Sequence, residues 1–476
     1  MPCTPAHSHG WPPRLRPAAS QVCLCVGLVA ALPLAARADQ AEERGHGVPS
    51  PSIATSLPDQ GDPYGVRRWL SEQGVNYGLV YKGEVLGNPS GGIRRGAIYE
   101  DRFETYTTAD FEKLIGWRGL SFYSNQFWIH ATGNLSREFV GNLVAISNIE
   151  ALPSNRLSEL WLEQKFLGDK ASIRVGQLTA DDNFYIARYS ELFINSDWPA
   201  ITKHDLPSGG PAYPLSTPGV RLAVEPAKDL LFQVAIFNGD PAGPGPADPE
   251  VKNRHGLNFR LRDPPFLISE VAYAYNQEKS ATGLAGDIKL GAWHHFGRFD
   301  DQRSDPQRLS LADISSTGIA ARLRGNDGIY GIIDQQIWRP AGGGADSGAA
   351  VFSRVSASPS DRNLIDFYLD GGITFAGLIP NRPDDKFGAT FIFAKISDSA
   401  RALDLDRIFF TGQPQPVRDY ELALNLTYQA QIRPGWSIQP DLQYIIHPGG
   451  HAPDPNNPSA PIRNAIVFGA RTTIVY

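Results

Sequence analysis

Long runs of strictly alternating apolar and polar residues constrain this chain more than any other feature of its sequence. The last run places Ile466, Phe468, Ala470, Thr472, Ile474 and Tyr476 on one face, and Val467, Gly469, Arg471 and Thr473 on the other. The runs that begin at 75, 420 and 438 have the same period. Each run spans about 9–13 residues, which suits a tilted membrane-spanning strand, whereas strands of soluble proteins average about 5–6 residues. The pattern therefore predicts a transmembrane β-barrel.

The connections between runs predict the number and direction of the strands. Short links fall at 168–170, 227–229, 263–265, 377–384 and 433–435. Such links lie on the periplasmic side of a bacterial barrel, and its strand number is even. About 17 runs fit the pattern, and omitting the weakest, 317–324, restores an even number. We therefore predict an all-β fold, an antiparallel barrel of about 16 strands, with 299–327 as a longer periplasmic connection and 179–218 as the longest extracellular loop.

A barrel of this size has a water-filled interior. About eight strands enclose a space that side chains fill, whereas about 16 strands leave an aqueous channel. With Tyr476 facing lipid, the alternation places the following polar residues in the lumen: Lys82, Glu84, Glu100, Arg102, Glu104, Arg174, Arg221, Asn258, Arg260, Glu421 and Arg471. A wide lumen lined by both signs of charge predicts conduction of polar solutes.

The N-terminus predicts export. Arg14 and Arg16 precede an apolar run at 22–36, and Ala36-Arg37-Ala38 is a small-x-small cleavage site. The apolar run is too short to span a membrane, so residues 1–38 are predicted to be a cleaved secretory signal peptide. All three cysteines, Cys3, Cys23 and Cys25, lie in this segment. The mature chain therefore cannot use disulfides, cysteine-bound zinc or thiol catalysis.

The remaining chain reads as one β-domain behind a short polar segment. Residues 39–74 are polar and end in a predicted short helix that begins at Asp62-Pro63 and stops at Gly74. Residues 75–476 form the predicted barrel. Removing residues 1–38 changes the net charge from −6 to about −9, so nothing favours nucleic acid as a partner.

Several short motifs in one order resemble the carbohydrate-selective outer-membrane porins of the OprB type. They lie at 74–81, 116–119 (Gly-Trp-Arg-Gly), 334–336 (Asp-Gln-Gln), 377–384, 439–449 and 464–471, and the resemblance covers 65–476. It implies a 16-stranded barrel in the outer membrane that takes up small sugars such as glucose, without a cofactor. It also implies lipid and lipopolysaccharide surroundings and insertion by the barrel-assembly machinery, and it leaves monomer and homotrimer open.

The residues predicted to line the pore and contact sugar are Glu84, Arg102, Arg174, Arg221, Arg260, Arg471 and, in the 179–218 loop, Trp198. Arginine and carboxylate groups can donate to and accept from sugar hydroxyls, and aromatic rings stack on the apolar face of a pyranose. The loop also holds acids, such as Asp181-Asp182, beside aromatic residues. Folded inward, it would narrow the pore; the alternative is an ordinary surface loop. For the lumen charges, the alternative is that they pair only with one another across strands.

Other functions find less support in the sequence. His294-His295 are adjacent on a predicted strand, so their side chains point to opposite faces and cannot share a metal ion. The chain has no zinc-protease or serine-nucleophile motif, and Asp181-Asp182 alone is a weak calcium signal. We therefore predict no catalytic residue and no metal site. The alternatives are a general or organic-anion porin, an outer-membrane barrel enzyme, and a secreted β-rich binding protein.

Overall fold

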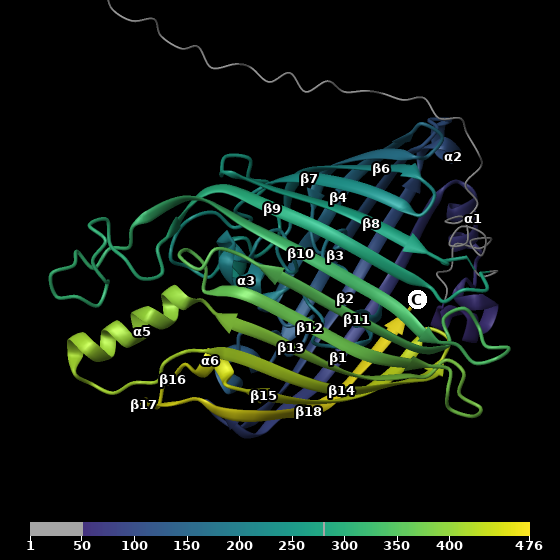
Figure 1. Ribbon diagram of the computed structural model, residues 1–476. Helices are drawn as coiled ribbons and strands as arrows, with labels where there is room; N and C mark the ends of the chain where they lie inside the picture. The colour runs from purple at the N-terminus through teal and green to yellow at the C-terminus, as the bar shows by residue number, and fades with distance from the viewer. Residues whose placement is uncertain (1–50, 279–280) are drawn as a thin grey trace, which may run out of the picture.

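The structure is a computed structural model that describes residues 51–278 and 281–476. The predicted signal peptide, 1–38, lies outside the described residues. Among these, sixteen strands close into one antiparallel barrel, as predicted (Figure 1). The barrel strands are β1 (Val75–Gly92), β2 (Gly96–Asp110), β3 (Leu120–Ala131), β4 (Ser154–Phe166), β5 (Ala171–Leu178), β6 (Thr217–Ala227), β7 (Leu230–Asn238), β8 (Pro265–Tyr275), β9 (Gly286–Asp300), β10 (Arg322–Trp338), β11 (Gly348–Ala357), β12 (Ile365–Ala376), β13 (Lys386–Ile396), β14 (Tyr420–Arg433), β15 (Trp436–Ile446) and β18 (Arg463–Val475).

The alternation of the sequence sorts side chains between the two faces of the barrel. Each barrel strand pairs with its neighbours, and β1 closes the barrel by pairing with β18, Glu84 opposite Arg471. On β14, Leu424 and Leu426 are exposed on the outer face, whereas Asn425 between them is buried inside. Because apolar side chains meet lipid at lower cost than polar ones, this sorting fixes the register of every strand.

The barrel has two different ends, which we call the terminal end and the loop end. The terminal end carries the C-terminus and α1 (Val66–Glu72); the loop end carries α5 (Asp398–Thr411) and the hairpin β16–β17 (Pro453–Asp454, Asn457–Pro461) (Figure 1). The remaining helices are α2 (Phe111–Ile115), α3 (Ala200–Asp205), α4 (Pro249–Lys252) and α6 (Pro448–His451). Shorter helical turns span Ile53–Ser56, Pro58–Gly61, Leu135–Val140, Arg188–Leu192 and Pro207–Gly209. No helix among the described residues is long and apolar enough to cross a membrane.

At the terminal end, the last residue contacts both β1 and α1. Tyr476 exchanges two backbone hydrogen bonds of 2.8 Å with Leu79. The Arg67 guanidinium lies 4.6 Å from the centre of the Tyr476 ring. The helix begins at Val66, three residues after the predicted first residue, Pro63. The Asp62 carboxylate lies ahead of it and accepts from the backbone N–H groups of Arg67 and Arg68, both at 3.0 Å.

Two predicted connections are wrong. Residues 257–262, expected as a strand ending in a turn at 263–265, form no strand. Arg260 instead folds back onto Asp263, 2.6 Å away. The β4 strand is contacted just ahead of this segment, where the Leu157 N–H donates to the His255 carbonyl. The connection of β9 to β10 is 301–321, not 299–327, and it lies at the loop end rather than the terminal end. The false strand at 257–262 reversed the predicted direction of the strands after it.

Candidate functional site

Residues 179–216, which we call the first inward loop, enter the barrel between β5 and β6. Of the two alternatives that the sequence left open for this loop, the structure shows the inward fold: Phe184, Tyr185 and Trp198 are almost fully buried. They pack on inward-facing side chains of β7 to β11, namely Ala235, Phe237, Phe266, Ile268, Trp293, Tyr330, Ile332 and Phe352. The Tyr185 and Tyr330 rings stack with their centres 3.6 Å apart. This part of the inner wall is therefore apolar because it forms a core with the loop.

Four strand residues, three buried and one half-buried, hold the backbone of the first inward loop. Glu270 accepts from the Tyr185 N–H at 3.2 Å, and Arg354 donates to the Tyr185 carbonyl at 3.2 Å. Lys289 donates to the Ile186 carbonyl at 2.7 Å. Asp334 accepts from the N–H groups of residues 188 and 189 at 2.9 and 3.0 Å. Since buried charges are costly unless paired, these contacts favour one position of the loop.

A second inward loop, 132–153, narrows the barrel near the loop end, which the sequence analysis did not anticipate. Its apolar residues, Leu135, Phe139, Val140, Val144 and Ile146, pack on the inner faces of β1, β2, β14, β15 and β18. Glu421 accepts from the N–H groups of Leu143 and Val144 at 2.8 and 2.7 Å. Asn148 joins this loop to the first one, because its N–H and side-chain amide donate to Ile194 and Ser196 carbonyls.

The two loops leave a central cavity of about 420 Å³ against the opposite wall, β1 to β4. Its charged lining residues are Lys82, Arg102, Glu104, Asp181, Asp182, Glu191, Asp197 and Arg354, and its aromatic ones are Tyr123, Phe127, Phe184, Tyr185, Trp198 and Tyr213. Burial, together with the neighbouring carboxylate of Asp182, raises the pKa of Asp181 from 3.8 to about 7. The cavity therefore combines hydrogen-bonding groups of both charges with aromatic faces.

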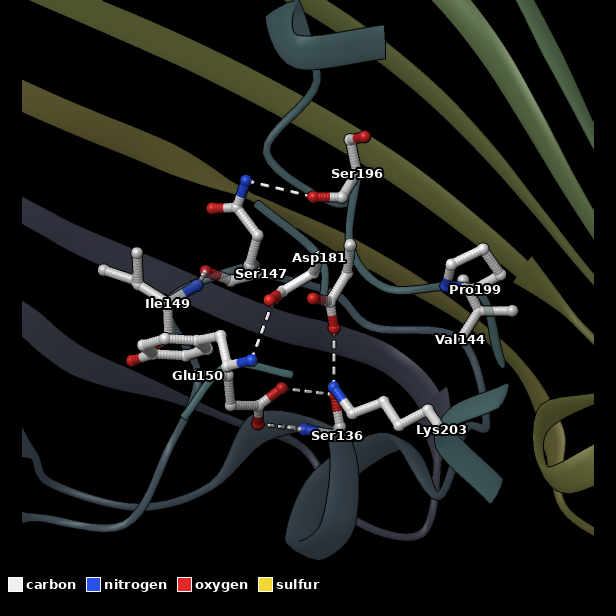
Figure 2. Close-up of polar contacts among 12 residues, drawn as sticks. Ser136, Val144, Ser147, Ile149, Glu150, Asp181, Ser196, Pro199 and Lys203 are labelled. Carbon is white, nitrogen blue, oxygen red and sulfur yellow. Dashed lines mark hydrogen bonds and ion pairs between the residues drawn. The ribbon is translucent and has the colours of Figure 1, made fainter. Parts of the chain in front are cut away.

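A second cavity, of about 390 Å³, lies beyond Trp198 and Tyr213, which line both spaces. Figure 2 shows the contact region of the two loops, where Lys203 and Glu150 face each other beside Ser136. Lys203 pairs with Asp197 at 2.6 Å, and Glu150 accepts from the Ser136 N–H at 2.9 Å. A third cavity, of about 350 Å³, shares Glu191 with the central one on its other side. The three spaces form a series through the barrel.

The structure brings some of the predicted site residues together. Arg102 lines the central cavity, 3.3 Å from Glu104 and 4.6 Å from the centre of the Phe127 ring. Trp198 lines it from the first inward loop. Arg174 and Arg221 both pair with Glu163, at 2.6 and 3.4 Å.

The other predicted residues have different positions. Glu84 and Arg471 form a buried pair, and Arg471 donates to the Asn148 side chain at 2.8 Å, so they support the second inward loop. Arg260 and Asn258 lie in the loop ahead of β8, outside the central cavity. His294 and His295 do point to opposite faces: His295 is buried and faces the Gly239 carbonyl at 2.9 Å, whereas His294 is part-exposed.

The residues that anchor the first inward loop are Glu270, Lys289, Asp334 and Arg354; only Asp334 stood out in the sequence, as part of the 334–336 motif and not as an anchor. The alternation places all four inside the barrel, and Glu270 and Arg354 interrupt apolar inner faces, next to Ile268 and Phe352. That interruption is the signal that could have found them. It becomes readable only once the loop is known to cover that wall.

A closed barrel of sixteen strands, with inward loops that narrow a polar interior, is the architecture of a porin. The family model described as "Carbohydrate-selective porin, OprB family" matches residues 94–476, and the chain belongs to this family. The barrel fold and the family place the protein in the outer membrane.

Individual relatives agree with this assignment. The chain is 24% identical to Porin B of Pseudomonas aeruginosa, covering 97% of this chain and 99% of that protein. It is 19% identical to the putative porin QuiX of Acinetobacter baylyi, covering 82% of this chain and 88% of that one. The high-pH structure of Pseudomonas putida OprB superposes with a TM-score of 0.74 at 21% identity, covering 88% of this chain and 98% of that one. This superposition shows a shared fold.

Proposed function

We propose that this porin is a passive channel for small neutral sugars, such as glucose-like monosaccharides, into the periplasm. The observation that carries the proposal is the lining of the central cavity, where aromatic rings lie beside side chains of both charges. Sugars carry no net charge, many hydroxyl groups and one apolar ring face. Arg102 and Glu104 can donate to and accept from the hydroxyls, while Trp198 and Tyr213 offer ring faces.

Passage requires that binding be weak. A solute must leave the cavity as readily as it enters, and several shallow sites in series permit this better than one deep site. The three cavities, separated by Trp198 and Tyr213 on one side and by Glu191 on the other, supply such a series. We propose Arg102 and Trp198 as direct sugar contacts, and Arg174 and Arg221 as pore-lining residues. Glu84 and Arg471 act in this proposal through the second inward loop.

Liposome swelling tests the proposal. Purified protein in liposomes should admit glucose fast, and admit gluconate, a charged solute of similar size, and sucrose much more slowly. Equal rates for all three solutes would contradict sugar selectivity and leave a general porin. Faster entry of gluconate would favour the alternative, an organic-anion porin, and would fit a dominant role for Lys82 and Arg102.

Further parts of the proposal concern export and surroundings. We propose that residues 1–38 are cleaved as a signal peptide, and that the aromatic last residue, Tyr476, suits recognition by the barrel-assembly machinery. Lipid and lipopolysaccharide are the proposed neighbours of the outer face, and a homotrimer remains a proposal that cross-linking in mild detergent tests. That the chain is a channel and not an enzyme also stays a prediction, to which its porin relatives lend support.

A further inference from the structure

Three side chains meet at the loop end, outside the channel lining. Asp419 directly precedes β14, His447 follows β15, and His451 ends α6. The Nδ1 atom of His447 lies 3.0 Å from one carboxylate oxygen of Asp419, and the Nδ1 atom of His451 lies 3.7 Å from the other. The two imidazole rings are stacked, with centres 4.2 Å apart. One ligand atom from each residue lies within 4.8 Å of the other two.

The backbone around this cluster is held in an uncommon shape. His447 and His451 both have positive φ angles, of 53° and 70°, which non-glycine residues seldom adopt. Gly449 and Gly450 between them also have positive φ angles. The turn is fixed to the neighbouring strand, because the Asp419 N–H donates to the Gly450 carbonyl at 2.9 Å. The strained backbone of this turn brings both imidazoles close to one carboxylate.

We propose that Asp419, His447 and His451 form a binding site for a divalent transition-metal ion, with Zn²⁺ as the best fit. Two imidazole nitrogens and one carboxylate oxygen are a ligand set that zinc accepts, with water in the fourth position. Ligand atoms on a tetrahedral zinc ion lie about 3.3 Å apart. The His447 Nδ1 lies 3.0 Å from one Asp419 oxygen and the His451 Nδ1 lies 3.7 Å from the other, both near this value. Binding one ion would turn the stacked rings so that both nitrogens face it. The side chains are each about a third exposed or less, which leaves room for the water ligand.

Two other histidine–aspartate pairs provide an internal comparison. His130 lies 2.9 Å from Asp101, and His294 lies 2.5 Å from Asp327. Neither belongs to a group of three metal-ligating side chains among the described residues. A simple hydrogen-bonded pair would behave alike at all three places, whereas a metal site needs the third ligand.

A bound ion would join parts of the loop end that the sequence separates. The turn 447–451 also donates to Glu421 through the Gly449 N–H at 2.7 Å. Glu421 in turn holds Leu143 and Val144 of the second inward loop. A metal ion on Asp419, His447 and His451 therefore stabilises the support of a loop that narrows the channel.

Calorimetric titration of Zn²⁺ into the untagged, chelator-treated protein tests the site. The expected result is saturation at one ion per barrel. His451→Gln and Asp419→Asn should each lower the affinity by about tenfold or more, and the matched control His130→Gln should leave it unchanged. A difference in gel migration between unheated and heated samples identifies the variants that still form the barrel.

Cobalt supplies a readout that does not depend on the variants. Co²⁺ added to the wild-type protein should give the intense visible absorption of a tetrahedral nitrogen–oxygen site, and Zn²⁺ should displace it. No saturable binding by the wild-type protein would overturn the proposal, and so would equal affinities in wild type and a folded His451→Gln variant. Neither outcome depends on sugar transport, so the proposed function stands or falls separately.

Discussion

Two parts of the inner wall follow the same alternation but carry opposite chemistry. On β1 to β6 the inward residues include Lys82, Arg102, Glu163 and Arg174, which face the water-filled space or pair across strands. On β7 to β11 the inward residues are mainly apolar and aromatic, and the first inward loop covers them. We call these the open wall and the covered wall.

Which residues face the inside of the barrel and which chemistry those residues have are two separate questions. Period two decides which residues face inward, because the pleat of a strand alternates its side chains. Whether inward residues are polar or apolar depends on whether they face water or another part of the chain. On the covered wall they meet another part of the chain, so they pack as a core, and their few charged members bind loop backbone. Substitutions should therefore cost folding stability on the covered wall and change permeation on the open wall.

The largest expected effect comes from the covered wall. Phe266 is fully buried between strand and loop residues, so Phe266→Ala should lower the free energy of unfolding by about 3–5 kcal/mol. Tyr123→Ala on the open wall removes a ring stacked 5.0 Å from Trp161 and should cost less than about 1.5 kcal/mol. Urea unfolding in detergent measures both. Equal losses would break the distinction between the walls.

A smaller effect is expected from an anchor of the loop. The Glu270 carboxylate accepts from the Tyr330 hydroxyl, the Gln233 amide and the Tyr185 N–H, at 2.9, 3.1 and 3.2 Å. Glu270→Gln sets an amide N–H₂ against these donors and should cost about 1–3 kcal/mol. Single-channel recordings should show noisier, larger currents as the loop loosens. Glu104→Gln, on the open wall, is the control: steady currents with altered ion selectivity are expected.

The next effect concerns permeation. Trp198→Ala removes the ring that lines both the central cavity and the next one. Loss of one aromatic contact of about 0.5–1.5 kcal/mol predicts about two- to tenfold weaker glucose binding, with faster entry of sucrose. Glucose-induced current noise and liposome swelling measure these. Arg260→Ala, outside the cavity, should leave both unchanged; an equal effect there would show that the response is not local.

The sequence predicted the barrel well because a lipid-facing surface imposes one rule on every strand. The outward apolar residues of β14, such as Leu424 and Leu426, and the inward Arg471 follow from that rule. The strand direction was mispredicted at 257–262, because three alternating apolar residues there satisfy the same rule although the segment forms no strand. The core between Phe266 and Tyr185 could not be predicted either, since it depends on where a loop folds and not on local periodicity.

The smallest expected effect is a dependence of loop stability and ion selectivity on pH. It arises in the central cavity, between the two walls. Asp181 lines the central cavity from the first inward loop and accepts from the Tyr213 N–H at 2.8 Å. Burial, with Asp182 adding to it, raises the pKa of Asp181 to about 7. Because the folded pKa is the higher one, the stabilisation of the loop by protonated Asp181 is complete below about pH 4 and is lost as the pH rises through about 7.

The same titration places a negative charge in the cavity as the pH rises. Reversal potentials in planar bilayers should therefore shift toward cation selectivity between about pH 6 and pH 8, centred on the pKa of about 7. In Asp181→Asn, which keeps an oxygen for the Tyr213 N–H, the selectivity should stay flat across this range. If the selectivity of the variant still shifts with pH as in the wild type, another group titrates in the cavity. The charge of the cavity would then not depend on Asp181 of the first inward loop.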